Sequence, residues 1–306
     1  MDGLARWLAA GTRFSYRGRS IFGREFLSGL GSGLGSGSIS DSTLVLVHGF
    51  PTSSFDWHRV WDALCARHRR VVALDMIGFG WSDKPRDYAY SIRDQADLHE
   101  AVLRSLGVEA FHVLAHDYGD TVAQELLARH DERAPDERAA FGIASMCFLN
   151  GGLFPETHRP RLVQRLLDSP LGFLLARAVN KRAFERSFVP IFGKKTRPTQ
   201  AELDAFWSLV SHDDGQHLFH KLIGYMRERR VHRARWVGAL THTDVPLRVI
   251  DGADDPISGA HMVARYRELV PNPDCVLLPG IGHYPQLEDP EGVLRAYFEF
   301  REARTS

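Results

Sequence analysis

Hydrophobic positions recur with two periods along the chain, and these periods predict strands that alternate with helices. Residues 12–26 alternate apolar and polar side chains around Arg17 and Gly18, which indicates a β-hairpin. Continuous apolar runs, typical of strands buried on both faces, then follow at 43–47, 71–75, 111–116, 144–149, 245–251 and 275–278. Apolar residues with helical spacing lie between them, at 52–64, 91–106 and 290–301.

The alternation of strands and helices stops at residue 153 and resumes near residue 243. Between these points the chain has helical stretches rich in Arg, Leu and Phe and no convincing strand. We therefore predict an α/β fold: an eight-stranded, mostly parallel, twisted sheet flanked by helices, with an all-helical cap inserted after strand 6. The core consists of residues 1–152 and 243–306, and the cap of residues 153–242.

Three segments need a separate interpretation. Residues 28–38, SGLGSGLGSGS, have a Gly/Ser composition that cannot build a packed core, so we predict a surface loop. The charged stretch 129–138 is also predicted to be a loop. The apolar run within residues 1–14 is too short to span a bilayer and contains Arg6, so we expect a short amphipathic helix, with no signal peptide and no clear membrane anchor.

The composition argues against several kinds of partner and cofactor. Of 306 residues, 38 are Lys or Arg and 38 are Asp or Glu, so no charge excess favours binding to nucleic acid. Cys65, Cys147 and Cys275 are too few and too widely spaced for a disulfide framework or a metal-binding cluster. A reducing, cytoplasmic location fits this cysteine content, and the oligomeric state is left open.

The sequence FHVLAHDYGDTVAQ, residues 111–124, is typical of a strand, a tight turn and a helix, with Asp117 at the turn. Ala115 and Gly119 are small, as such a turn requires. This arrangement is the nucleophile elbow of G-x-S-x-G hydrolases with a carboxylate in place of the serine hydroxyl. A carboxylate attacks an sp³ carbon that carries a leaving group, and the product is an alkyl ester that must then be hydrolysed.

Hydrolysis of such an ester needs a base and two oxyanion donors, and the sequence offers candidates for each. His283 follows the last predicted strand and is the candidate base. Among the acids of VIDGADDP we select Asp255 as its partner, with Asp254 as the fallback. The backbone N–H groups of Phe50 and Tyr118 are the candidate oxyanion donors. No metal or organic cofactor is then required.

The leaving group decides the substrate class. Ring opening of an epoxide produces an alkoxide that needs a proton donor such as tyrosine, whereas a released halide needs N–H donors. Tyr225 is the only tyrosine of the predicted cap, so it is the candidate proton donor, and packing within the cap is the alternative role. For His48, beside the predicted oxyanion loop, we expect a buried, hydrogen-bonding role rather than a chemical one.

The chain resembles the Asp-nucleophile branch of the α/β-hydrolase superfamily, which contains epoxide hydrolases and haloalkane dehalogenases. Five motifs carry the resemblance: HGFPTSSFDW, DMIGFGWSDKP, LAHDYGD, GADDP and GHYPQLEDPE. Within this branch the chain is most similar to the mesoderm-specific transcript-like hydrolases, through HDYGDTVAQELL, NGGLFPETHRP, RARWVGAL and HYPQLEDP. The resemblance extends from about residue 14 to the carboxyl end.

What the resemblance implies depends on where the chain departs from each group. Haloalkane dehalogenases usually have tryptophan after the nucleophile and often asparagine after the HG pair, where this chain has Tyr118 and Phe50. We therefore expect an epoxide hydrolase that forms vicinal diols from a small apolar substrate and water. Hydrolytic cleavage of carbon–halogen bonds is the alternative. A third possibility is a hydrolase fold that binds a lipid or a protein without catalysis.

Overall fold

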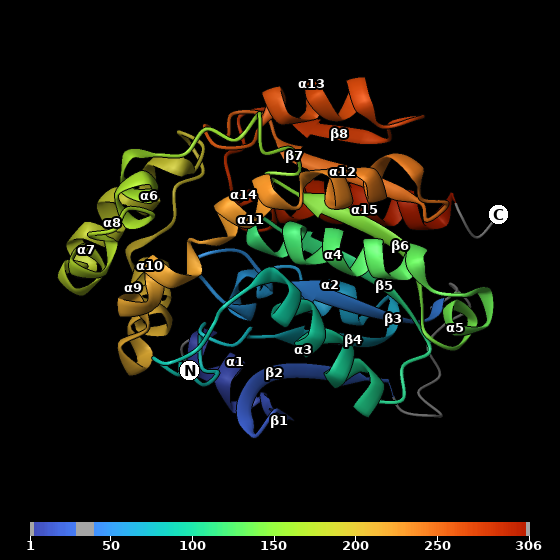
Figure 1. Ribbon diagram of the computed structural model, residues 1–306, viewed down its shortest axis with the longest axis horizontal. Coiled ribbons are helices and arrows are strands. Elements are labelled where there is room, and N and C mark those ends of the chain that lie inside the picture. Colours follow the sequence, from blue (N-terminus) through green and yellow to red (C-terminus); the bar gives the residue numbers. More distant parts are fainter. Residues whose placement is uncertain (1–2, 29–39, 304–306) are drawn as a thin grey trace.

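The computed structural model describes residues 3–28 and 40–303 and contains one eight-stranded sheet with the order β1-β2-β4-β3-β5-β6-β7-β8 (Figure 1). β1 pairs antiparallel with β2, and β2 with β4, whereas all later pairs are parallel. The predicted fold class is therefore confirmed. The strands are β1 (Thr12–Tyr16), β2 (Arg19–Leu27), β3 (Ser40–Val47), β4 (His68–Leu74), β5 (Ala110–His116), β6 (Gly142–Leu149), β7 (Leu247–Gly252) and β8 (Cys275–Leu278).

Helices cover both faces of the sheet, which explains why its central strands are apolar on both sides. Leu44, Val45, Leu46 and Val47 of β3 are all fully buried. In Figure 1, α3 and α4 lie in front of the sheet, with α2 and α15 behind it. The helices of the core are α1 (Gly3–Ala9), α2 (Trp61–Cys65), α3 (Ile92–Ser105), α4 (Tyr118–Glu132), α5 (Pro135–Ala140), α13 (Ala260–Leu269), α14 (Pro285–Glu288) and α15 (Pro290–Glu302).

Two local predictions were wrong. The stretch 52–64 is a short 3₁₀ turn, η1 (Ser54–Trp57), followed by α2, because the Asp75 carboxylate accepts the Ser54 N–H at 2.8 Å and ties this turn to the neighbouring loop. The charged stretch 129–138 is helical, since it contains the end of α4 and the start of α5. Pro135 starts α5, and the Glu137 side chain accepts the Ala134 N–H at 3.2 Å. Of the predicted Gly/Ser loop, residues 29–38 lie outside the described residues.

Between β6 and β7 the chain forms only helices: α6 (Leu162–Leu167), α7 (Gly172–Ala178), α8 (Lys181–Phe188), η2 (Val189–Ile191), α9 (Gln200–Ser211), η3 (His212–Leu218), α10 (Phe219–Leu222), α11 (Tyr225–Val231) and α12 (Arg233–His242). Figure 1 shows α6 to α10 at one end of the molecule, whereas α12 runs along α4. There the Trp236 indole N–H donates to Glu125 of α4 at 2.7 Å. We propose that residues 153–242 form a cap whose last helix is fastened to the core.

None of the helices in the two described ranges is long and apolar enough to cross a membrane.

Candidate active site

Asp117 sits on the sharp turn between β5 and α4, as the sequence predicted. Its backbone has φ 49° and ψ −105°, a conformation that costs a non-glycine residue of order 1–3 kcal/mol and persists only where the surroundings enforce it. The turn is tight because α4 starts against β3. A Cβ atom on Gly119 would lie only 2.3 Å from the carbonyl oxygen of Val47, so only glycine fits there.

The two oxygens of the Asp117 carboxylate have different surroundings. Oδ2 accepts a hydrogen bond from the Phe50 backbone N–H at 3.1 Å. Oδ1 lies 3.8 Å from Nε2 of His283. Tyr118 is the first residue of α4, so its amide N–H has no acceptor within the helix. The structure thus brings both predicted oxyanion donors to the turn and leaves Oδ1 on the side of the imidazole.

His283 and Asp255 form a buried pair at the ends of β8 and β7. The imidazole Nδ1–H donates to Asp255 Oδ2 at 2.8 Å, which turns Nε2 toward Asp117. Burial disfavours the imidazolium, but the Asp255 and Asp117 carboxylates outweigh it and raise the pKa of His283 to about 9. The same geometry distinguishes the two candidate acids, because Asp254 points into solvent and Asp255 is buried against the imidazole.

Four further donors hold the Asp255 carboxylate in place. Oδ1 accepts the Ile257 N–H at 2.8 Å, and Oδ2 accepts the Asn150 side-chain amide at 3.0 Å and both the hydroxyl and the N–H of Ser258 at 2.9 and 3.1 Å. Although burial opposes ionisation, the charge and hydrogen bond of His283 and these donors lower the pKa of Asp255 below its usual value. Asp255 is therefore a fixed anion that orients the imidazole.

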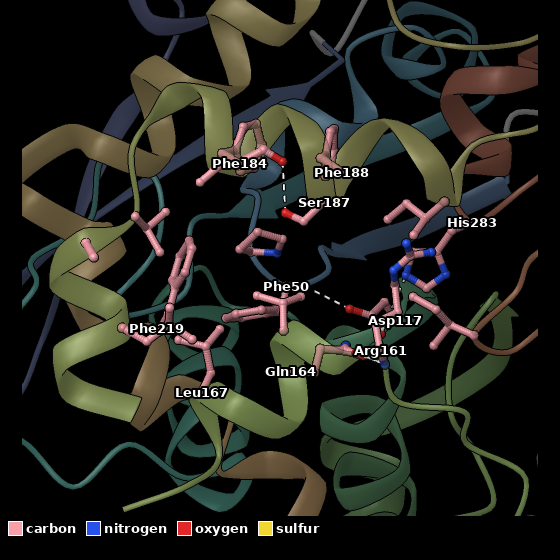
Figure 2. A pocket seen from close by; sticks show the side chains of 18 residues that line it. Phe50, Asp117, Arg161, Gln164, Leu167, Phe184, Ser187, Phe188, Phe219 and His283 are labelled. Carbon is pink, nitrogen blue, oxygen red and sulfur yellow. Dashed lines mark hydrogen bonds and ion pairs between the residues drawn. The ribbon is translucent and has the colours of Figure 1, made fainter. Parts of the chain in front are cut away.

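Asp117 and His283 both open onto a cavity of about 150 Å³ (Figure 2). Its wall is mostly apolar and is built by the cap, because α6 contributes Val163 and Leu167, α8 contributes Phe184 and Phe188, and α10 contributes Phe219. The polar cap groups in the wall are those of Arg161, Gln164 and Ser187. Such a cavity accepts a small apolar molecule and presents it to one carboxylate and one imidazole.

Tyr225 lies close to this site but is not among the residues that line the cavity. Its ring is buried and packs against the rings of Tyr118 and Phe50, with centroid distances of 4.9 and 6.3 Å. The Arg229 guanidinium lies over the same ring at 4.5 Å, and burial raises the pKa of the Tyr225 hydroxyl. The structure therefore brings Asp117, Asp255 and His283 together with the two predicted oxyanion donors. Tyr225 is the exception, because it lies behind the wall of the cavity.

His48 has the structural role that the sequence suggested. Its Nδ1 donates to the Gly49 carbonyl at 2.8 Å, and its Nε2 accepts the Met76 N–H at 3.0 Å. Burial lowers the pKa of His48 to about 3, so the ring is neutral and shapes the loop that carries Phe50.

Sequence reasoning missed several groups that shape the site. Asn150 and Ser258 were not assigned, although an asparagine directly after a strand end was a usable signal for the first. Arg229 was missed too: from the cap it donates to the Asp117 carbonyl at 3.0 Å and to the Thr121 hydroxyl at 2.7 Å, and so braces the turn. Arg161 gave no signal, because its position in the cavity wall depends on how the cap folds.

Across residues 3–28 and 40–303, no group of three or more His, Cys, Asp or Glu side chains is arranged to hold a metal ion.

Comparisons with known proteins agree with this architecture. A family model described as alpha/beta hydrolase fold matches residues 42–139. The mesoderm-specific transcript protein of Mus musculus is 43% identical over 303 residues, which cover 97% of this chain and 87% of that protein. Similar solved structures include the haloalkane dehalogenase DatA of Agrobacterium tumefaciens C58 (TM-score 0.76, 19% identity, 95% of each chain) and the epoxide hydrolase CorEH (TM-score 0.74, 17% identity, 95% of this chain and 97% of that chain). At these identities, the two structures show a shared fold.

Proposed function

Because the chain belongs to the α/β-hydrolase superfamily, among the relatives of the mesoderm-specific transcript proteins, we propose that it hydrolyses epoxides to vicinal diols through an alkyl ester on Asp117. One observation carries the proposal. A carboxylate, not a hydroxyl, occupies the strained turn, with one oxygen held by the Phe50 N–H and the other 3.8 Å from a paired imidazole. This arrangement suits attack on carbon followed by hydrolysis of an ester.

In the first step, Asp117 Oδ1 attacks a ring carbon of the epoxide and forms a carbon–oxygen bond. The bond between that carbon and the epoxide oxygen breaks, and the oxygen takes up a proton. We assign this proton to Tyr225, the tyrosine of the cap. Because its hydroxyl does not line the cavity, the assignment requires a small movement of the ring past Phe50, and it is tested separately below.

In the second step, neutral His283 removes a proton from a water molecule, and the water oxygen attacks Cγ of Asp117. The developing oxyanion on Oδ2 is stabilised by the Phe50 N–H, which already binds this atom, and by the Tyr118 N–H. When the intermediate collapses, the bond between Cγ and Oδ1 breaks and the departing alkoxide takes the proton from His283 to become the diol. The second proton of the water leaves Asp117 as its carboxylate is restored. Asp255 keeps Nδ1 protonated, so that Nε2 is the basic nitrogen.

Hydrolysis of haloalkanes is the alternative proposal, since Asp117 and His283 would perform the same two steps. The leaving halide would need N–H donors, and in the described cavity wall these come from Arg161 and Gln164, because the wall includes no tryptophan or asparagine. This set is weaker than a pair of indole or amide donors aimed at one point, so we favour the epoxide. Halide release measured beside diol formation, on matched substrates, distinguishes the two.

Isotope transfer under single turnover tests the covalent route. With enzyme in excess over an epoxide in ¹⁸O-labelled water, we expect one label in the peptide that contains Asp117, because water attacks Cγ and not the substrate carbon. His283→Gln should stop at the ester, so that the same peptide gains the mass of the substrate. Label that appears only in the diol, with no adduct in His283→Gln, would refute the covalent route. If Asp117→Asn and His283→Ala change nothing that the protein does, the fold serves for binding instead.

A further inference from the structure

Exposed hydrophobic side chains gather on one part of the cap. Seven large apolar side chains are exposed in the described chain, and five of them lie between residues 162 and 174, on α6, α7 and the turn between them. We call these five the cap patch: Leu162 (73% exposed), Leu166 (47%), Leu171 (66%), Phe173 (42%) and Leu174 (54%). Clustering of this kind marks an interaction site, whereas single exposed apolar residues are ordinary.

The patch helix α6 carries apolar side chains both toward the cavity and toward solvent. On α6, Val163 and Leu167 face the cavity, while Leu162 and Leu166, one turn apart, face solvent. A helix on the surface of a globular protein normally has one apolar stripe toward the core and a polar opposite face. The second apolar face of α6 therefore lacks a covering partner within the described residues.

The same segment carries a strong positive charge. Residues 159–197 contain ten Lys or Arg residues and two acids, a net charge of +8 in a chain whose net charge is zero. Arg165, Arg177 and Arg182 are exposed, and none of the ion pairs within the described residues involves them. Figure 1 places α6, α7 and α8 together at one end of the molecule, so the exposed arginines and the cap patch come from one group of neighbouring helices.

We propose that the cap patch docks this protein on an anionic phospholipid bilayer. Exposed leucines and a phenylalanine enter the boundary between headgroups and acyl chains, while the surrounding arginines bind lipid phosphates and carboxylates. A second copy of the chain is the poorer partner, because a symmetric contact would bring the exposed Arg165, Arg177 and Arg182 of both copies together. Charge complementarity thus favours a negatively charged surface with an apolar interior.

Docking in this way would also determine the source of the substrate, a step that rests on the proposed function. The helices that carry the cap patch lie between the lipid and the cavity, since other side chains of the same helices line the cavity that contains Asp117 and His283. A lipophilic epoxide dissolved in the bilayer would reach the cavity between these helices without crossing water. The substrate class is therefore a lipophilic epoxide that partitions into the bilayer and is small enough for the cavity.

Vesicle flotation with the full chain tests the docking. We expect binding to vesicles that contain phosphatidylserine, weaker binding to pure phosphatidylcholine, and release at about 1 M salt. Leu171→Ser should weaken binding about tenfold, because serine loses the burial of an apolar side chain in the bilayer. The double variant Arg165→Gln with Arg177→Gln should weaken binding about twentyfold, because it loses two contacts with anionic lipid. Val231→Ser is the matched control, since Val231 is 75% exposed outside the patch, and it should bind like the wild type.

Failure of docking would look different from failure of the proposed function. Absence of vesicle binding by the wild type, equal effects of Val231→Ser and Leu171→Ser, or a wild-type dimer that Leu171→Ser dissociates would each overturn the docking proposal. If docking holds, Leu171→Ser should slow hydrolysis of a small lipophilic epoxide dissolved in vesicles and spare a water-soluble one. If the wild type binds vesicles and hydrolyses neither epoxide, the proposed function fails and the docking surface stands.

Discussion

Replacing Asp255 with asparagine tests the central pair of the site while leaving its shape almost unchanged. In the wild type, this carboxylate is the largest contributor to the raised pKa of His283. Asparagine removes the charge. It also places an NH₂ group among donors, because Oδ1 accepts from Ile257 and Oδ2 accepts from Asn150, Ser258 and His283. The variant therefore loses both the electrostatic support of the imidazolium and part of its alignment.

The size of the effect follows from the pKa. Raising the pKa of His283 from 6.5 to about 9 corresponds to about 3 kcal/mol in favour of the imidazolium, in spite of its burial. Hydrolysis of the ester creates this imidazolium in its transition state, so Asp255→Asn should slow hydrolysis about a hundredfold. Formation of the ester should change less than tenfold, because Asp117 attacks carbon without needing a base.

Rapid mixing with an epoxide substrate, acid quenching and mass spectrometry of the Asp117 peptide follow both steps. We expect the peptide to accumulate the mass of the substrate in Asp255→Asn and not in the wild type. Asp254→Asn is the matched control, because Asp254 is exposed beside the pair. If Asp254→Asn accumulates the ester as much as Asp255→Asn does, or if neither variant accumulates it, the assignment of Asp255 is wrong.

If Tyr225 donates the proton, Tyr225→Phe should slow ester formation about a hundredfold and leave ester hydrolysis unchanged in rapid-mixing experiments; an unchanged rate of ester formation would show that the tyrosine only packs. Gly119→Ala should lower the free energy of unfolding by about 3 kcal/mol in denaturant titrations, because its Cβ would meet the Val47 carbonyl, whereas Gly238→Ala, with open space around it, should not destabilise. The pKa of His283 is about 9 in the folded protein and 6.5 in the unfolded chain. Its positive charge therefore stabilises the fold fully below pH 6.5, and this contribution of about 3 kcal/mol is lost as the pH rises through 9. The unfolding free energy of the wild type should therefore fall more steeply over this pH range than that of His283→Gln, and parallel curves would contradict the assignment.

Much of the core could be predicted because its elements are specified locally. A parallel strand buried on both faces needs a continuous apolar run, so β3 and β5 were visible in the sequence. Site groups in this architecture follow strand ends, so Asp117, Asp255 and His283 could be proposed as a site from their positions along the chain. Where a non-local contact decides the local structure, the prediction failed, as at residues 52–64, where Asp75 holds the first turn.

The surroundings of the site could not be predicted, because they depend on residues far apart in sequence. Asn150 reaches Asp255 across 105 positions, and Arg229 reaches the Asp117 carbonyl across 112. In the cap, helical periodicity identifies apolar faces but not what covers them. On α6 both faces are apolar, so the sequence alone does not tell which residues line the cavity and which form the cap patch.

The charge of Asp117 couples the two proposed steps. Before reaction, the Asp117 and Asp255 carboxylates keep His283 protonated near neutral pH, in which form it is not a base. In the proposed route, esterification removes the negative charge of Asp117, which is one of the charges that raise the pKa of His283, so this pKa falls and the imidazole gives up its proton more readily. Ring opening of an epoxide consumes one proton at the same moment, and the proton lost by His283 can replace the one that Tyr225 donates. His283 thus becomes a more available base once the ester exists, because the bond that forms on Asp117 also removes one of the charges that had kept the imidazole protonated.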